Sequence, residues 1–234
     1  MNSDTTKILD FLSELNNGEF NQKFSNKNIC KFTDEQRTEY ETLLKKLIDV
    51  HEKDHFTTKE KGELLEKISA FVLEKSGSLF SVQKNVRTRT NELDQLVSLN
   101  PSGKFFAKNG LISNYFENFI CECKNYNKKV SVTYVGKLYS LMQTCNLNFS
   151  ILFSYYGVTG SGWNDSSGLI RKIYLSTNGS HNNSCIIDFN LTDFKAIKDG
   201  DNLLDIVERK IQSLKYDTDF SEYIKPHPAE TILK

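Results

Sequence analysis

The sequence predicts an α/β protein in which helices flank a central mixed β-sheet. Capping motifs open two amphipathic helices before residue 77, and the apolar period then changes from helical to alternating. From there to the C-terminal part of the chain, predicted strands alternate with predicted helices. The expected order is helix, three strands, helix, strand, helix, strand, helix, which is typical of a layered fold with a mixed sheet.

The N-terminal region is expected to be helical. Apolar residues recur at helical spacing over 5–15, whereas 16–32 is polar and irregular. Thr33 and Gln36 form a capping box that predicts a helix ending near residue 52. We therefore expect an N-terminal helical extension over residues 1–57, a main domain over 58–215 and a C-terminal tail over 216–234.

A second capping box, Thr57 with Glu60, predicts a helix over 58–76, and Gly77 is expected to end it. The alternating or apolar segments that follow are expected to be strands at 78–90, 92–99, 114–125, 149–158 and 184–189. The remaining helices are expected at 133–145, 165–174 and 202–215, with turns at 100–103 and 157–162.

Composition limits the function classes. The chain has 234 residues, 38% of them apolar, and a formal net charge of zero. A nucleic-acid-binding protein of this composition needs a local basic patch, because it has no global positive field. The N-terminus lacks the pattern of a secretory signal, no segment is apolar enough to span a membrane, and five cysteines are an odd number. We expect a cytoplasmic protein with reduced thiols.

The segment NFICECKNYNKKV, residues 118–130, places charges in an otherwise apolar strand. Because alternate residues of a strand face opposite sides, Glu122 and Lys124 share one face, and Cys121 and Cys123 share the other. A solvated ion-pair neighbourhood is one interpretation of this pattern. The apolar surroundings favour a second interpretation, in which the charges form a functional site.

Asp94 lies in the preceding strand between Leu93 and Leu96, so it can converge with Glu122 if the two strands pair. Two converging carboxylates repel each other unless a cation lies between them. Carboxylate oxygens, one backbone carbonyl (that of Cys123) and water suit Mg²⁺ or Mn²⁺. Lys124 can then orient a metal-bound water or help to deprotonate it.

Asp94 followed by CECK, with Glu122 and Lys124, resembles the signature of the PD-(D/E)xK superfamily, and the fit is closest to restriction-endonuclease-like proteins of the Mrr type. The resemblance covers about residues 58–190. It implies a restriction-endonuclease-like three-layer core and a Mg²⁺-dependent endonuclease that hydrolyses phosphodiester bonds of double-stranded DNA in restriction or genome defence. Asp94, Glu122 and Lys124 would be catalytic. The segment GELLE is similar to the family's helix motif and implies an accessory role for Glu66, with Glu63 as the competing residue.

A nuclease needs cations that hold the phosphate backbone. The candidates are Lys84, Arg87, Arg89, Lys128 and Lys129, with Lys104, Lys108 and Lys137 as further neighbours. Such contacts give affinity without sequence selectivity. No helix-turn-helix or zinc finger is evident, and the N-terminal helices could supply sequence readout or form a homodimer.

Two other functions stay open at this point. The same fold could be a catalytically inactive module that binds nucleic acid or a partner protein. Residues 51–55, HEKDH, match the H-E-x-x-H pattern of zinc peptidases, with His51 and His55 as ligands and Glu52 as base. Because the helix is expected to end here, a solvated helix end is the preferred interpretation of this motif.

Overall fold

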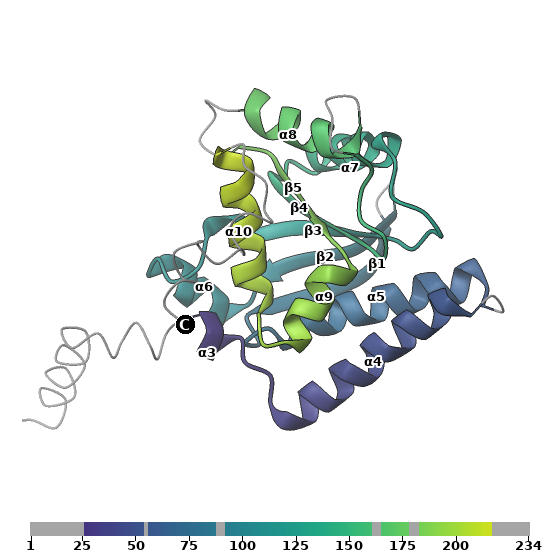
Figure 1. The fold of residues 1–234 in the computed structure, drawn as a ribbon. Coiled ribbons are helices and arrows are strands. Elements are labelled where there is room, and N and C mark those ends of the chain that lie inside the picture. The colour runs from purple at the N-terminus through teal and green to yellow at the C-terminus, as the bar shows by residue number, and fades with distance from the viewer. Residues whose placement is uncertain (1–25, 54–55, 88–91, 161–164, 178–182, 217–234) are drawn as a thin grey trace, which may run out of the picture.

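The computed structural model describes residues 26–53, 56–87, 92–160, 165–177 and 183–216, which form an α/β fold around one five-stranded mixed sheet (Figure 1). The strands are β1 (Phe80–Arg87), β2 (Glu92–Leu99), β3 (Asn118–Lys124), β4 (Phe149–Ser154) and β5 (Cys185–Phe189). They lie in the order of the chain. β1, β2 and β3 pair antiparallel, and β3, β4 and β5 pair parallel.

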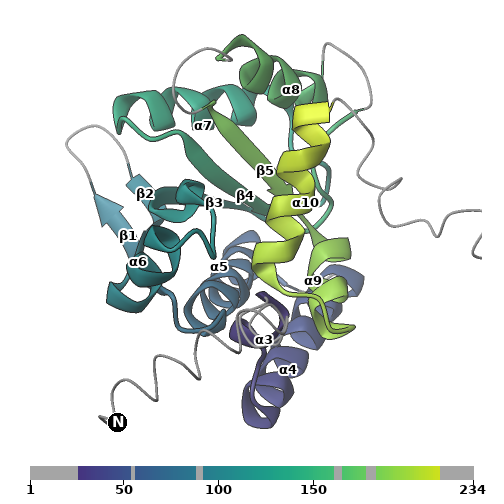
Figure 2. The same ribbon diagram turned by 90° about the vertical axis from the view of Figure 1, so that its left-hand side faces the viewer.

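Helices cover both faces of the sheet. α4 (Asp34–Glu52), α5 (Thr58–Lys75) and α9 (Leu191–Lys198) pack on one face, and α7 (Val132–Thr144) and α8 (Ser166–Ser176) pack on the other. Both ribbon views show this separation, with α10 (Leu203–Tyr216) running across β5 (Figures 1 and 2). The sheet therefore separates two apolar cores, as the predicted three-layer arrangement requires.

The predicted α4 and α5 are confirmed, and both capping boxes are formed. Tyr40, Leu43, Leu44 and Leu47 of α4 lie in the same buried cluster as α5. α4 therefore completes the core on this face of the sheet. The short helix α3 (Asn26–Ile29) lies in a region expected to be irregular. The helix expected over 5–15 and the tail beyond residue 216 lie outside the described residues.

The segment expected as a turn at 100–103 instead begins a helix, α6 (Pro101–Lys108). The side chain of Asn100 accepts a hydrogen bond from the Gly103 backbone N–H at 3.0 Å, and Pro101 occupies the first helical position. Both residue types also favour turns, so the local sequence did not separate the two structures. A Cβ atom on Gly103 would lie 2.4 Å from the Leu79 carbonyl oxygen, so this glycine allows close packing.

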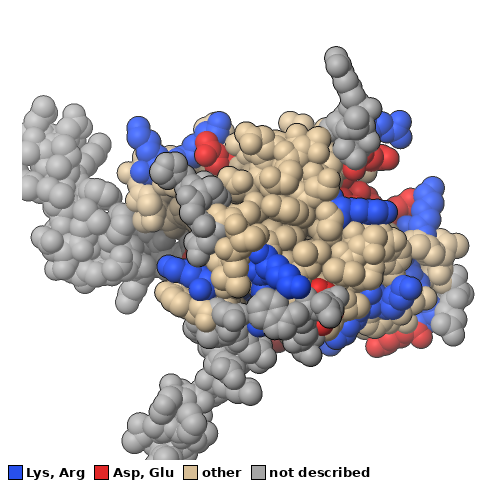
Figure 3. All heavy atoms as spheres, turned by 90° about the horizontal axis from the view of Figure 1, so that it is seen from above, with Lys and Arg blue, Asp and Glu red and all other residues tan. Residues whose placement is uncertain are grey.

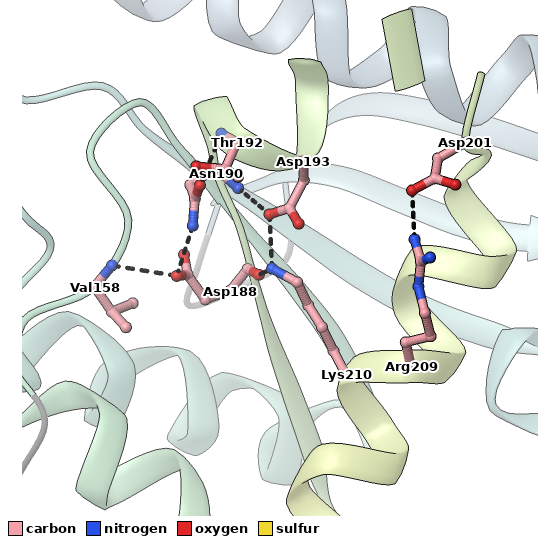
Figure 4. A network of polar contacts seen from close by, with 8 residues as sticks. All are labelled: Val158, Asp188, Asn190, Thr192, Asp193, Asp201, Arg209 and Lys210. Carbon is pink, nitrogen blue, oxygen red and sulfur yellow. Dashed lines mark hydrogen bonds and ion pairs between the residues drawn. The ribbon is translucent and has the colours of Figure 1, made fainter. Parts of the chain in front are cut away.

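α9 was not predicted, although Asn190 and Asp193 form a capping box at its start. This helix and α10 hold the end of β5 through one lysine, shown in Figure 4. Lys210 Nζ donates to the Asp188 carbonyl oxygen at 2.5 Å and to Asp193 Oδ2 at 2.6 Å. Asn190 Nδ2 also donates to Asp188 Oδ2 at 3.1 Å. The carboxyl end of β5 is therefore fixed by partly buried polar contacts.

The other expected elements are confirmed with shifted ends, except that residues 88–90 of the first expected strand and 161–162 of the expected turn lie outside the described residues. β3 is shorter than expected because a turn of 3-10 helix, η1 (Asn114–Phe116), precedes it. β4 ends at Ser154, after which Gly157 accepts a hydrogen bond from Val130 N–H at 2.8 Å. All five cysteines are free thiols. Within the described ranges, no helix has the length and apolar character needed to cross a bilayer.

Candidate functional site

The charged strand β3 alternates as the sequence predicts. Cys121 and Cys123 are buried in the core on the α5 side, where Cys123 Sγ lies 3.3 Å from the Ser69 hydroxyl. Glu122 pairs in register with Leu152, which belongs to the core under α7 and α8. Glu122 and Lys124 therefore project toward the opposite face from the two cysteines.

Asp94 lies where the hairpin of β1 and β2 changes its orientation. In β1, Val82 packs on the α5 side but Val86 packs on the α7 side, although a regular strand would place both on one face. Between them, Asn85 has a left-handed backbone with φ of 52°. The neighbouring pairs in the register put Asn85 opposite Asp94. The left-handed residue rotates the hairpin at the level of the aspartate.

At the end of the β2–β3 ladder, the carboxylate of Asp94 accepts a hydrogen bond in place of a backbone carbonyl. The last paired residues are Gln95 and Cys121. One step further, Asp94 Oδ2 accepts a hydrogen bond of 2.7 Å from the Cys123 backbone N–H. This contact fixes Asp94 beside the residue that separates Glu122 from Lys124.

The Lys124 ammonium lies between two carboxylates. It donates a hydrogen bond to Glu122 Oε1, and its Nζ atom is 4.0 Å from Asp94 Oδ2. About a fifth of each of these three side chains is exposed. Burial alone would lower the pKa of Lys124, but Glu122 and then Asp94 outweigh burial and raise it. The structure thus brings together the three residues on which the sequence interpretation depends, and the lysine is their shared cation.

Glu66 of α5 is a carboxyl group on which the charges of this cluster act. Its pKa is raised first by burial and next by the charge of Asp94, while Lys124 opposes the shift. The pKa of Glu122 is raised by the same two causes in the same order. Glu63, the competing residue, is exposed and pairs with Lys59 at 3.7 Å on the outer side of α5. Glu63 thus has an ion-pair partner on α5, whereas the charge of Asp94 acts on Glu66.

A buried glutamine that the sequence analysis did not single out connects these elements. Gln95 is 1% exposed, and its Nε2 atom donates to the Glu66 carbonyl oxygen at 3.1 Å and to Ser69 Oγ at 2.8 Å. Ser69 in turn contacts Cys123. One side chain next to Asp94 therefore ties the strand to the backbone of Glu66 and, through Ser69, to β3. Its polar character in a buried strand was the available signal.

The loop after Lys124 is held by α4 and α5. Asn125 is buried, accepts a hydrogen bond from His51 Nε2 at 2.7 Å and donates to the Lys61 carbonyl oxygen. Lys61 is also buried, and its Nζ atom donates to Asn127 Oδ1 at 2.9 Å. Two alternate asparagines thus anchor the chain directly after the E-x-K segment.

The zinc-motif histidine is therefore a packing residue in the structure. The ring of His51 stacks on Tyr155 with centroids 3.7 Å apart and an angle of 13°. Burial lowers the pKa of His51 and favours its neutral form. α4 does end at Glu52 as predicted, but the expectation of a solvated helix end is wrong for His51. His55 lies outside the described residues.

The expected DNA-binding cations differ in their ion-pair partners and in their exposure. Lys84 pairs with Glu74 at 2.9 Å and Arg87 pairs with Glu92 at 3.6 Å. Lys128 and Lys129 are exposed in the loop after β3, and Arg89 lies outside the described residues. Seen from the side of α7 and α8, the basic groups form separate islands and not one continuous field (Figure 3).

The donor types of the cluster fit a hard divalent cation. Asp94 and Glu122 present carboxylate oxygens, and the pKa of Glu122 is raised first by burial and next by the negative charge of Asp94, which a bound cation would offset. As the side chains stand, the described part of the chain contains no group of three or more His, Cys, Asp or Glu residues arranged to hold a metal. Binding would require Lys124 to leave Glu122. The Cys123 carbonyl stays a predicted ligand.

Comparison of the chain with protein-family models, with curated proteins and with solved structures finds no match in any of the three.

The raised pKa values predict how stability depends on pH without divalent ions. In the unfolded chain, Glu66 and Glu122 lose their protons near the ordinary glutamate pKa of about 4.5, whereas in the folded state their raised pKa values keep these protons bound to higher pH. The unfolding free energy should therefore fall as pH rises from about 4.5 through the raised pKa values. Asp94→Asn removes the common repelling charge and should flatten this fall. Denaturant unfolding at a series of pH values in EDTA measures it.

The exposed Asp34 at the start of α4 provides the matched control, because Asp34→Asn should leave the slope as in the wild type. Asp188, whose pKa burial also raises, supplies a slope that both variants keep. Equal slopes in the wild type and Asp94→Asn would show that Asp94 does not repel the two glutamates.

His51→Ala leaves the side-chain oxygen Oδ1 of Asn125 without its hydrogen-bond donor and removes the ring stacked on Tyr155, so it should lower the unfolding free energy by about 1–3 kcal/mol. The loss should be the same with zinc and with EDTA, and Glu52→Ala should have little effect. Because the pKa of His51 is lowered, its contribution is present above pH about 6.5 and is lost as pH falls. A zinc-dependent loss would favour the peptidase motif.

Proposed function

We propose that this protein is a metal-dependent endonuclease that hydrolyses phosphodiester bonds of double-stranded DNA. One observation carries the proposal: two carboxylates, Asp94 and Glu122, converge on the ammonium of Lys124 at the end of two adjacent strands. The sequence resemblance to PD-(D/E)xK nucleases rests on the same three residues. A role in restriction or genome defence follows from that resemblance alone.

In this proposal, the acidic residues would bind the metal ion and the lysine would act on the phosphate. Asp94 and Glu122 would hold Mg²⁺ or Mn²⁺, which when bound supplies Lewis-acid polarisation of a phosphate oxygen and lowers the pKa of its water. Lys124, released from Glu122, would place its positive charge beside the phosphate, where negative charge develops during hydrolysis. Glu66, with its raised pKa, could accept or hold a proton near the attacking water.

The surrounding contacts support this assignment because they hold the side chain of Asp94, the backbone of Glu66 and the chain after Lys124 in place. Asp94 is fixed by the Cys123 N–H, Glu66 by Gln95 and the chain after Lys124 by Asn125. Groups that must act together at one phosphate need such positional support. The exposed Lys128 and Lys129, four and five residues after Lys124, would contact the phosphate backbone.

A second candidate function is a catalytically inactive module of the same fold that binds nucleic acid or a partner protein. The direct contact between Lys124 and Glu122 favours it, because the lysine already neutralises the carboxylate that a metal would need. Under this function, binding would persist without divalent ions and no strand would be cut.

Incubation of the purified protein with plasmid DNA and Mg²⁺, Mn²⁺ or EDTA separates these functions. The nuclease proposal predicts nicking or linearisation that requires a divalent ion. Lys124→Ala should lower the cleavage rate by roughly 100-fold or more, since it removes a charge that acts on the transition state. Lys59→Ala, an exposed lysine of α5 paired with Glu63, is the matched control and should cleave as the wild type does.

Thermal unfolding of each variant verifies that it is folded. Metal-independent binding without cleavage in the wild type would support the inactive module. Equal cleavage by the wild type and a folded Lys124→Ala variant would contradict the assignment of the site.

A further inference from the structure

The aromatic side chain of Tyr126 lies beside the charged cluster. It is two residues beyond Lys124. Burial and a hydrogen bond with Tyr134 raise the pKa of Tyr126, and the charges of Lys124 and Glu122 act on it in opposite directions. Glu122, Lys124 and Tyr126 occupy alternate positions, and Tyr126 meets Tyr134 of α7 with ring centroids 5.3 Å apart and an angle of 42°. The tyrosine therefore lies on the same face of the sheet as the acidic and basic groups.

The backbone on both sides of Tyr126 is anchored. Asn125 is buried and bonded to His51 and to the Lys61 carbonyl oxygen, and Asn127 accepts from Lys61 Nζ. With its two neighbours directed toward α4 and α5, Tyr126 is presented toward α7. A ring held this way loses little conformational entropy when a ligand stacks on it.

The surroundings of this ring pair are basic and open to solvent. Tyr126 and Tyr134 are both partly exposed. Lys137 Nζ lies 5.5 Å from the centroid of Tyr134, and Lys128 and Lys129 are exposed in the adjoining loop. Aromatic faces next to cations are the combination that binds single-stranded nucleic acid, because the rings stack on bases while the cations hold phosphates.

The bases of a regular duplex are stacked on each other and offer no free face to a side chain. We propose that Tyr126, supported by Tyr134, stacks on an unpaired base of the DNA substrate next to the cleaved phosphate. This inference rests on the proposed function and narrows its substrate to DNA that contains an unpaired nucleotide within a duplex. The neighbouring lysines would hold the phosphates that flank this nucleotide.

Fluorescence of 2-aminopurine, which falls when the base stacks, tests the inference directly. The probe is a duplex with one unpaired 2-aminopurine, and the control probe is the same duplex with that base paired. Ca²⁺ replaces Mg²⁺ so that the strand is not cut. The wild type should quench the unpaired probe and bind it more tightly than the paired one. Absence of quenching on saturation of the wild type would overturn the inference without any substitution.

Variants then assign the effect to the ring. Tyr126→Leu should abolish the quenching and weaken binding of the unpaired probe by roughly tenfold, the effect of one lost stacking contact. Tyr126→Phe keeps the ring and should behave as the wild type does. Undiminished quenching by a folded Tyr126→Leu variant would overturn the assignment to Tyr126.

A third variant separates this inference from the nuclease proposal. Lys124→Ala should lose cleavage but keep the quenching. If the wild type quenches but cuts no DNA with Mg²⁺ or Mn²⁺, the nuclease proposal fails and the base site stands. If it cuts paired and unpaired DNA equally, with no dependence on Tyr126, the base site fails and the nuclease proposal stands.

Discussion

The hydrogen bond from the Cys123 backbone to the Asp94 carboxylate is the contact on which the geometry of the site depends. It forms where the ladder between β2 and β3 stops, so a side chain completes the pairing that the backbone no longer provides. The aspartate is thereby held beside a residue whose two neighbours are Glu122 and Lys124. A carboxylate that turned away at this point would leave Glu122 with the lysine alone.

Several features of the fold serve this one contact. The left-handed Asn85 rotates the hairpin opposite Asp94, and Gln95 ties the same strand to the backbone of α5. On the far side of Lys124, Asn125 ties the chain to α4 and α5. Burial of three carboxyl groups near one ammonium costs stability, as the raised pKa values of Glu66 and Glu122 indicate. A local loss of stability of this kind, offset by polar contacts from β2, α4 and α5, is typical of a functional site.

Local sequence patterns were sufficient for most of the fold. The two capping boxes and the change of apolar period gave α4, α5 and the antiparallel strands, and alternation in β3 placed the cysteines and the charged pair on opposite faces. α6 was missed because Asn100 and Pro101 favour a turn as well as a helix start. α9 was missed because it is only eight residues long, so no long segment of apolar residues at helical spacing follows its capping box at Asn190.

The candidate site was predictable only in part, for a physical reason. The residues that carry charge stand out in an apolar strand, and the convergence of Asp94 with Glu122 follows from strand pairing. The residues that position them do not stand out, since the partners of Gln95 and Asn125 lie 26 to 74 positions away in the chain. Such contacts form only when the tertiary structure brings the helices onto the sheet.

We propose that Asp94 and Glu122 together hold one divalent ion. Electron paramagnetic resonance of free Mn²⁺ during titration with the protein measures this binding directly. We expect the wild type to bind Mn²⁺, Asp94→Asn and Glu122→Gln each to weaken the binding, and the double variant to lose less than the sum of the two single losses, because the carboxylates act on the same ion. Equal Mn²⁺ binding by the wild type and the double variant, or none by the wild type, would contradict the claim.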